Sequence, residues 1–266
     1  MTLEKKTEVA EVGVILPVFS PGPHIKNIVE SLANQNFKNF RLIVIDDDHT
    51  EEFRLLQIAL LDKLEPKLSK AIVFLSTPAR GSGPAVARNI GLANLREPFT
   101  CFFDCDDFWY EDFLEKMYAK INSRSADVVV CHSTINNGVE QISLSLPNHY
   151  SRFQLLQTNI LSMPCVMVRN SALSHLYFPL CGHEDYAFWL KNIGENFEVS
   201  IVSDVLVEIT KTPGSVSSKK LRSLGWYIRL IVEQTDARWL LPFYVVMYVL
   251  NAVNKRLGLL NRIVVL

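Results

Sequence analysis

Continuous apolar runs alternate with amphipathic segments over the first half of the chain. Runs that are apolar throughout are typical of strands buried on both faces, whereas apolar residues three or four positions apart are typical of helices. Strand–helix alternation of this kind predicts an α/β fold with a mostly parallel sheet flanked by helices. The sequence predicts strands at residues 12–19, 41–45, 71–75 and 99–103, and helices that begin at Ile25, cover 51–64 and run from 84 to 95.

The second half of the chain is less regular. Amphipathic helical patterns follow Pro213 and Gly214 to the last residues. Because residues 211–218 are polar and contain this Pro-Gly pair, they are the best candidate for a linker. We therefore expect one domain over residues 1–210 and a helical tail over residues 211–266. Within the first of these, the patterns predict strands at 127–131, 165–169 and 199–209 and helices at 150–161 and 184–192.

Charge is divided unequally along the chain. The whole chain has a net charge of −1, which gives no sign of a nucleic-acid partner. The tail over residues 211–266 has nine basic and two acidic residues, a net charge of +7, so the rest of the chain carries −8. A basic and apolar tail suits an anionic surface as its partner. It equally suits packing against the acidic body, and the sequence leaves both explanations open.

The five cysteines are scattered and form no disulfide or zinc-binding pattern. The first residues are too polar for a secretory signal. The most apolar stretch, residues 239–250, is too short to span a membrane and contains Pro242, so it suits a buried or an interfacial helix. We therefore expect a cytoplasmic protein with reduced thiols.

Acidic residues follow two of the expected strands where those strands end. Residues 46–48 are all aspartates after the second strand, and Asp104, Asp106 and Asp107 follow the fourth. Ligands of parallel α/β sheets bind beyond the carboxyl ends of the strands, so these side chains should converge on one rim. Carboxylates suit Mn²⁺ or Mg²⁺, which also bind phosphate oxygens. The alternative for Asp104 and Asp106 is a solvated loop without a ligand.

Three further residues have both a structural and a functional explanation. Asp47 could cap the following helix, or accept a hydrogen bond from a nucleobase or ribose. Arg88 could form a surface ion pair, or face the aspartates and a bound diphosphate. Asp185 lies in the first turn of an expected helix, where it could stabilise the helix dipole or take part in chemistry. The sequence pattern leaves both explanations open for each residue.

The order of these segments resembles that of the family 2 glycosyltransferases, which have the GT-A fold. The bacterial polysaccharide and lipopolysaccharide branches are the most similar. The resemblance implies a GT-A catalytic domain that binds a nucleotide-sugar, followed by a C-terminal helical extension. The shared segments, within residues 12–194, are VGVILPVFS, RLIVIDDDHTEE, GSGPAVARNIGLANL, FTCFFDCDDFWYEDFLEKM and GHEDYAFWLKNIG.

The resemblance implies a donor-binding role for four residues outside the acidic cluster. Pro17 and Phe19 match positions that contact the nucleotide. Asp47 matches the aspartate that recognises the base, usually uracil. Arg88 matches an arginine near the donor. Together these residues would form the nucleotide side of the site.

The resemblance also implies the reaction. Asp104 and Asp106 match the pair that holds the donor and a Mn²⁺ or Mg²⁺ ion, and Asp185 matches the general base. The implied activity is inverting transfer of a hexosyl group from a nucleotide-sugar, expected to be a UDP-sugar. The implied acceptor is a saccharide or a polyprenyl-diphosphate-linked sugar in cell-surface polysaccharide synthesis. The segment after the second strand departs from the family, because Asp48 replaces the usual Gly and His49 the usual Ser.

A lipid-linked acceptor would give the basic tail a function at the inner face of the cell membrane. Basic and aromatic side chains of residues 211–266 could hold the enzyme at an anionic lipid surface. The alternatives are a packed helical pair and a homodimer face. The aromatic residues expected at the surface are Trp226, Tyr227, Trp239, Phe243 and Tyr244.

Two other functions fit parts of the pattern. A sugar-nucleotide nucleotidyltransferase would need a glycine-rich loop with Lys or Arg after the first strand, and the loop here, SPGPHIKN, has one Gly and one Lys. A non-catalytic domain that binds a nucleotide-sugar or glycan would not need Asp104, Asp106 and Asp185 together. The retention of these three acids favours the enzyme.

Overall fold

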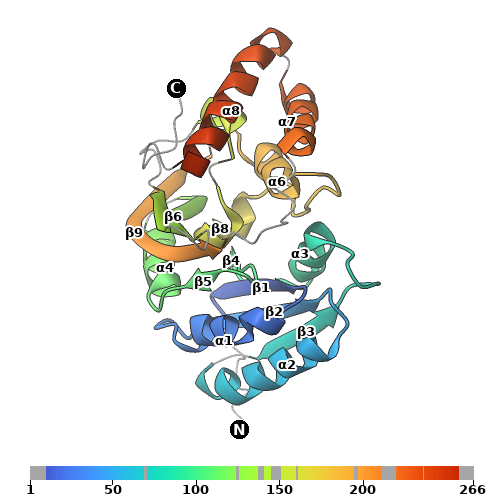
Figure 1. Ribbon diagram of the computed structural model, residues 1–266. Helices are drawn as coiled ribbons and strands as arrows, with labels where there is room; N and C mark the ends of the chain where they lie inside the picture. Colours follow the sequence, from blue (N-terminus) through green and yellow to red (C-terminus); the bar gives the residue numbers. More distant parts are fainter. Residues whose placement is uncertain are drawn as a thin grey trace.

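The computed structural model describes residues 10–68, 71–123, 126–136, 141–144, 151–159, 161–194, 197–210, 220–235 and 237–257. A nine-stranded sheet forms the centre of this part of the chain, with the strand order β3-β2-β1-β4-β8-β6-β9-β5 and with β7 beside β6. Two C-terminal helices, α7 and α8, lie at the end of the molecule opposite α2 (Figure 1).

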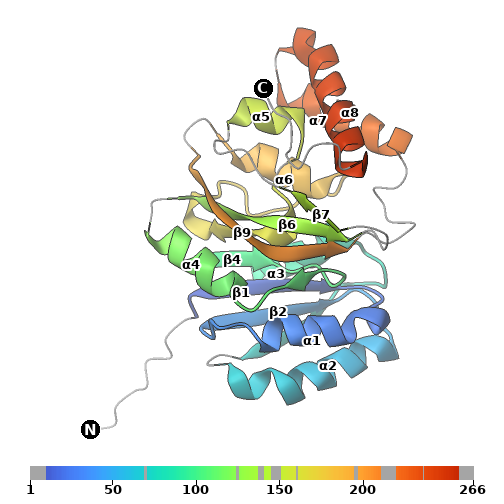
Figure 2. The same ribbon diagram turned by 60° about the vertical axis from the view of Figure 1, so that its left-hand side comes forward.

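The strands of the N-terminal half form the parallel part of the sheet. Neighbouring strands in the order β3-β2-β1-β4 are all parallel. Helices α1 and α2 lie on one face of these strands and α3 on the other (Figures 1 and 2), as right-handed crossovers require when the chain first moves toward β3 and then reverses to β4. The elements predicted here are confirmed. They are β1 Val12–Val18, α1 Ile25–Ala33, β2 Phe40–Asp46, α2 Glu51–Lys63, β3 Ile72–Ser76, α3 Pro84–Ala93 and β4 Phe99–Phe102.

The rest of the sheet is mixed. Strand β8 is antiparallel to both β4 and β6, β9 is parallel to β6, and β5 is antiparallel to β9. The expected parallel arrangement therefore describes the N-terminal half only, because antiparallel neighbours need no crossover helix between them. The elements are β5 Phe108–Trp109, α4 Phe113–Ser123, β6 Val128–Asn136, β7 Gln141–Leu144, α5 Arg152–Gln157, β8 Val166–Arg169, α6 Glu184–Asn192 and β9 Val199–Thr210.

Helix α5 is shorter than the 150–161 segment that the sequence pattern predicts. It begins after Ser151, whose side chain accepts from the Gln154 amide while the Gln154 side chain accepts from the Ser151 amide. This reciprocal capping fixes the first turn. The helix stops at Thr158, which has an extended backbone.

Close packing between α3 and β1 sets the position of one wall of the strand-end region. A Cβ atom added at Gly91 would lie 2.6 Å from Ile15 Cγ2, so only glycine allows this approach of the helix to the strand. Ile15 itself is completely buried in the core between the two layers. The last turn of α3 is thereby held against the middle of β1, and the first turn of the same helix begins at the strand-end pocket.

The C-terminal helices are α7 Lys220–Gln234 and α8 Leu241–Leu257, which gives the helical extension that was expected. They pack against the body, because Tyr227 and Tyr244 are buried and the Tyr227 hydroxyl donates to the Leu156 carbonyl at 2.7 Å. These two tyrosines therefore cannot form part of a membrane-facing surface, contrary to expectation. Trp239, by contrast, is 79% exposed. The proposed linker at 211–218 lies outside the described residues.

None of the helices in the described ranges combines the length and apolar character that crossing a bilayer requires.

Candidate functional site

A pocket of about 360 Å³ lies at the carboxyl ends of β1, β2 and β4 and at the start of α3. Sequence reasoning expected seven site residues, and six of them line this pocket. A larger hollow of about 510 Å³ beside α1 and β5 contains none of the seven. The expected convergence on one rim is therefore present in the fold. The lining residues are Pro17, Val18, Phe19, Asp47, Gly81, Gly83, Pro84, Arg88, Asp104, Cys105 and Asp106.

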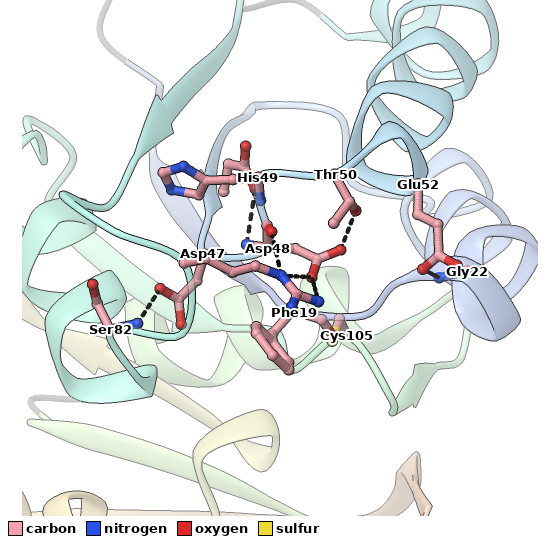
Figure 3. A network of polar contacts seen from close by, with 11 residues as sticks. Phe19, Gly22, Asp47, Asp48, His49, Thr50, Glu52, Ser82 and Cys105 are labelled. Atoms are coloured by element: carbon pink, nitrogen blue, oxygen red, sulfur yellow. Dashed lines mark hydrogen bonds and ion pairs between the residues drawn. The ribbon is translucent and has the colours of Figure 1, made fainter.

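Asp47 is buried and organises the loop before α3. Its Oδ1 accepts from the Ser82 amide at 2.8 Å (Figure 3). The same oxygen accepts from the Thr77 hydroxyl at 2.8 Å, and Oδ2 accepts from the Gly83 amide at 2.9 Å. Gly81 and Gly83 have φ of +70° and +97°, which lets the loop turn its amides toward the carboxylate. Since a carboxylate has about four acceptor positions, these three bonds leave about one on Oδ2.

The helix-cap explanation for Asp47 is wrong. Thr50 is the N-cap residue of α2. Asp46, the neighbour of Asp47, also serves the turn rather than the helix, because its Oδ1 accepts from the Asp48 and His49 amides at 3.0 and 2.7 Å. The acidic segment therefore shapes the strand end, and Asp47 is the one of its three aspartates that lines the pocket.

Asp48, in place of the usual glycine, has a local partner for its charge. Its carboxylate accepts from the Thr50 hydroxyl and from Arg80, whose Nη2 lies 3.0 Å from Oδ1 (Figure 3). Burial alone would raise the pKa of Asp48, but these bonds and the charge of Arg80 lower it. The left-handed backbone of the turn falls on His49, with φ +54°. The Arg80 guanidinium also lies 5.3 Å from the ring of Phe19 in the pocket wall.

Arg88 joins the pocket to the start of α6. It is only 5% exposed, and its Nη2 donates to Asp104 Oδ1 at 2.7 Å while its Nη1 donates to Glu184 Oε1 at 3.0 Å. Its Nε has no partner among the described residues. Burial alone would lower the pKa of the guanidinium, but the two carboxylates raise it, so the side chain stays protonated. Arg88 is thus a buried ion-pair residue that faces the aspartates.

The acidic cluster after β4 is under mutual repulsion. Burial, followed by the charge of Asp104, raises the pKa of Asp106. Asp107 is buried, its Oδ1 accepts from the Thr210 amide at 3.0 Å, and burial and its acidic neighbours raise its pKa. Trp109, which follows the cluster, is fully buried, and its ring centroid lies 4.7 Å from that of Phe103, the residue before Asp104. A cation between the carboxylates would remove the repulsion.

The residues present fit a divalent cation that arrives with a phosphate ligand. No group of three or more His, Cys, Asp or Glu side chains in the described ranges is arranged to hold a metal ion unaided. Asp104 and Asp106 nevertheless both line the pocket. Mg²⁺ is commonly bound by one or two carboxylates, with the remaining positions filled by substrate phosphates and water. This donor set suits such a site.

Asp185 is the one expected site residue that does not line the pocket. It follows Glu184 in the first turn of α6, and its Oδ2 accepts from the Asn159 side chain at 2.8 Å. Glu184, the residue before Asp185, binds Arg88, and Arg88 lines the pocket. Asp185 is therefore the sequence neighbour of a residue that contacts the pocket wall. Sequence reasoning did not include Glu184, Asn159, Thr77 or Arg80 in the site. Of these, only the adjacency of Glu184 to Asp185 gave a signal.

The chain is similar to known proteins along nearly its whole length. Residues 13–176 match the family described as glycosyl transferase family 2. The putative teichuronic acid biosynthesis glycosyltransferase TuaG of Bacillus subtilis (strain 168) is 26% identical over 255 residues, which cover 92% of this chain and 97% of TuaG. The UDP-Glc:alpha-D-GlcNAc-diphosphoundecaprenol beta-1,3-glucosyltransferase WfgD of Escherichia coli is 22% identical over 247 residues, which cover 92% of this chain and 94% of WfgD.

The fold is also that of solved structures. The crystal structure of S. aureus TarS 1–349 in complex with UDP-GlcNAc matches with a TM-score of 0.65 at 23% identity, covering 92% of this chain and 73% of that one. The expected GT-A fold is thereby confirmed. The family match extends from β1 to beyond β8 and includes the whole strand-end pocket. The chain therefore belongs to glycosyltransferase family 2.

Proposed function

We propose that this protein is an inverting, metal-dependent hexosyltransferase that uses a UDP-sugar in cell-surface polysaccharide synthesis. The observation that carries the proposal is the single pocket in which Asp47, Arg88, Asp104 and Asp106 meet. The relatives support the setting, since TuaG is named for teichuronic acid biosynthesis. WfgD is named for a UDP-Glc donor and a diphosphoundecaprenol-linked acceptor, which supports the same donor and acceptor classes here.

Asp47 supports uracil as the base. Uracil offers one imide N–H, whereas the corresponding edge of guanine offers two neighbouring donor groups. Because Thr77, Ser82 and Gly83 occupy about three of the four acceptor positions of the Asp47 carboxylate, about one remains for a ligand. A single remaining acceptor suits the single donor of uracil, and it would leave one guanine donor unpaired at a cost to affinity.

The diphosphate would lie between Arg88 and the aspartates. Asp104 and Asp106 would hold the cation, which when bound offsets the charge that develops on the leaving diphosphate. The free Nε–H of Arg88 points to a further donor for the same group, because the other guanidinium nitrogens are already bound to carboxylates. Phe19, 46% exposed at the pocket wall, would contact the nucleoside.

Asp185 would accept the proton of the acceptor hydroxyl. As the proton leaves, the hydroxyl oxygen forms a bond to the anomeric carbon and the bond from that carbon to the diphosphate oxygen breaks. One displacement of this kind inverts the anomeric configuration. Asn159 donates to Asp185 Oδ2, so the carboxylate is held by one oxygen and the other remains available to take the proton.

The test is UDP release from UDP-glucose and UDP-N-acetylglucosamine with Mn²⁺, with GDP-mannose as the comparison donor. Asp185→Asn should lower the rate by about 100-fold or more, with UDP affinity unchanged, because a general base supplies about 10²–10⁴ in rate. The matched control is Asp204→Asn, an exposed residue paired with Lys116. A wild-type rate in Asp185→Asn would remove Asp185 as the base. UDP binding without any turnover would instead favour a non-catalytic nucleotide-sugar-binding domain.

We also propose that the exposed side of α8 contacts an anionic membrane. Val246, Val249, Leu250 and Val253 recur at helical spacing and are all exposed. They belong to a tail with a net charge of +7, and apolar and basic residues together are typical of an interfacial helix.

Sedimentation with phosphatidylglycerol vesicles tests this surface. Leu250→Glu should abolish binding, whereas Leu176→Glu, an equally apolar exposed position between β8 and α6, should not. If Leu250→Glu instead dissociates a dimer and leaves vesicle binding unchanged, the surface is a dimer face.

A further inference from the structure

The residue before the Glu184–Asp185 pair has an unusual backbone conformation. His183 is the N-cap residue of α6, yet its φ is +58°, a left-handed conformation that is uncommon outside glycine. Its side chain makes no capping bond to the helix. The conformation must therefore be held by contacts from elsewhere in the protein.

Those contacts come from the C-terminal helices. His183 Nε2 lies 2.8 Å from the Ser223 hydroxyl and 3.1 Å from the Ser223 carbonyl oxygen, both on α7. The Ser223 hydroxyl in turn lies 3.1 Å from the Tyr248 hydroxyl on α8. Ser223, the central member of this polar chain, is buried, and His183 and Tyr248 are partly exposed. Both tail helices thus reach the residue that begins α6.

A second contact fixes the preceding residue. A Cβ atom added at Gly182 would lie 2.0 Å from Trp226 Cδ2, so the indole ring packs directly on the bare backbone. The same ring meets His183 edge to face, with ring centroids 5.6 Å apart. Ser223 and Trp226 lie three residues apart and therefore on one face of α7, which covers the segment before the helix.

The anchored backbone leads directly into the first turn of α6. The Ala187 amide donates to the His183 carbonyl at 2.9 Å, which closes the first helical turn around Asp185. A rigid His183 therefore fixes the start of the helix from the side of the tail. None of the residues that line the donor pocket comes from α6, α7 or α8.

We propose that α7 and α8 position the general base through His183, with Ser223 and Tyr248 as positioning residues. This rests on the proposed role of Asp185 as the base. Loosening the anchor would misplace the Asp185 carboxylate relative to the acceptor while the donor pocket stays intact. A misplacement of about 1 Å can lower a rate by about 100-fold.

Ser223→Ala removes the hydroxyl that joins His183 to Tyr248, and Ser223→Thr keeps a hydroxyl at the same position. The matched control is Ser123→Ala, whose hydroxyl donates to the Lys120 carbonyl at the end of α4. For each variant, kcat and the donor KM are measured by UDP release from UDP-glucose or UDP-N-acetylglucosamine. UDP affinity is measured by calorimetry, and protection of the Ala187 amide by hydrogen exchange.

In Ser223→Ala we expect kcat to fall by about tenfold or more, with donor KM and UDP affinity within about twofold of wild type. Hydrogen-exchange protection of the Ala187 amide should fall as well in this variant. Ser223→Thr should recover most of the loss in kcat and most of the loss in protection. Ser123→Ala should change neither kcat nor protection. An unchanged kcat overturns the proposal, as does a proportional loss of kcat and UDP affinity, which would indicate general unfolding.

Different results would contradict the proposed enzyme function and the proposed anchoring of His183. A wild-type protein that releases no UDP from either donor contradicts the hexosyltransferase proposal. Unchanged Ala187 protection in Ser223→Ala overturns the anchoring itself, whichever donor the wild-type protein uses.

Discussion

Replacing Arg88 with methionine would leave Asp104 and Glu184 without the cation that now joins them. The Arg88 side chain is 6% exposed, and it forms bonds of 2.7 and 3.0 Å to carboxylates that are 27% and 20% exposed. Removing one partner of a buried ion pair costs about 3–5 kcal/mol. Because both carboxylates retain some contact with water, we expect the lower end, about 3 kcal/mol. That corresponds to a fall in Tm of about 6–12 °C for a protein of this size.

The loss of stability in Arg88→Met should depend on pH and become smaller as the pH falls. Burial and the charge of Asp185 raise the pKa of Glu184 even with Arg88 present. Without Arg88 this pKa rises further above its unfolded value, so the folded variant binds the proton more readily than the unfolded chain does. The variant therefore regains stability relative to wild type as the pH falls.

Urea unfolding of wild type and Arg88→Met at about pH 7.5 and about pH 5.5 measures both effects. The matched control is Arg54→Met, because Arg54 and Glu51 form an ion pair in which both side chains are about 70% exposed. Such a pair contributes about 0–1 kcal/mol. A loss for Arg88→Met no larger than that of the control, or the same loss at both pH values, would refute the view that the two carboxylates need this cation.

Three further changes test separate parts of the site. Asp47→Asn should weaken UDP binding by about tenfold or more, because its amide NH₂ group would face the Gly83 amide or the base. The control Asp46→Asn keeps an acceptor oxygen for the turn and should bind UDP normally. Calorimetry measures UDP affinity for both variants. Asp48 has a pKa lowered from 3.8, so the stability it adds is present above that pH and is lost as the pH falls below it. Thermal unfolding between about pH 5 and pH 3 should therefore show a steeper loss in wild type than in Asp48→Asn. Excess chelator should abolish UDP release, and full activity in chelator would exclude a cation on Asp104 and Asp106.

The residues of the strand-end pocket could be predicted because their position depends on local signals. The Asp46-Asp47 pair and Asp104 each follow directly on an apolar run, and the runs are neighbours of β1 in the parallel part of the sheet. Once these strands are recognised, their carboxyl ends must share an edge. Phe19 reaches the same pocket for the same reason, since it follows β1 directly.

The partners of these residues could not be predicted, because they are distant in sequence. Arg88 and Glu184 are 96 residues apart, and nothing near either one indicates the other. Asn159 lies in the loop after α5 without a periodic pattern, yet it holds Asp185. The capping explanation for Asp47 was wrong for a related reason, since the Ser82 and Gly83 amides that bind it come from the loop before α3. Strand β5 has two residues, too few for any periodicity.

The start of α6 is held from two directions that the Glu-Asp sequence does not reveal. On the side of the strand-end pocket, Arg88 binds Glu184 and Asp104 at once, so the helix is tied to the end of β4. On the opposite side, Ser223 holds His183. A carboxylate acts as a base only where it meets the acceptor hydroxyl, and under the role proposed for Asp185 these ties would set that position. A family 2 sequence that retains Glu-Asp at this helix but lacks the arginine and the tail contacts would then have the proposed base residue without its fixed position.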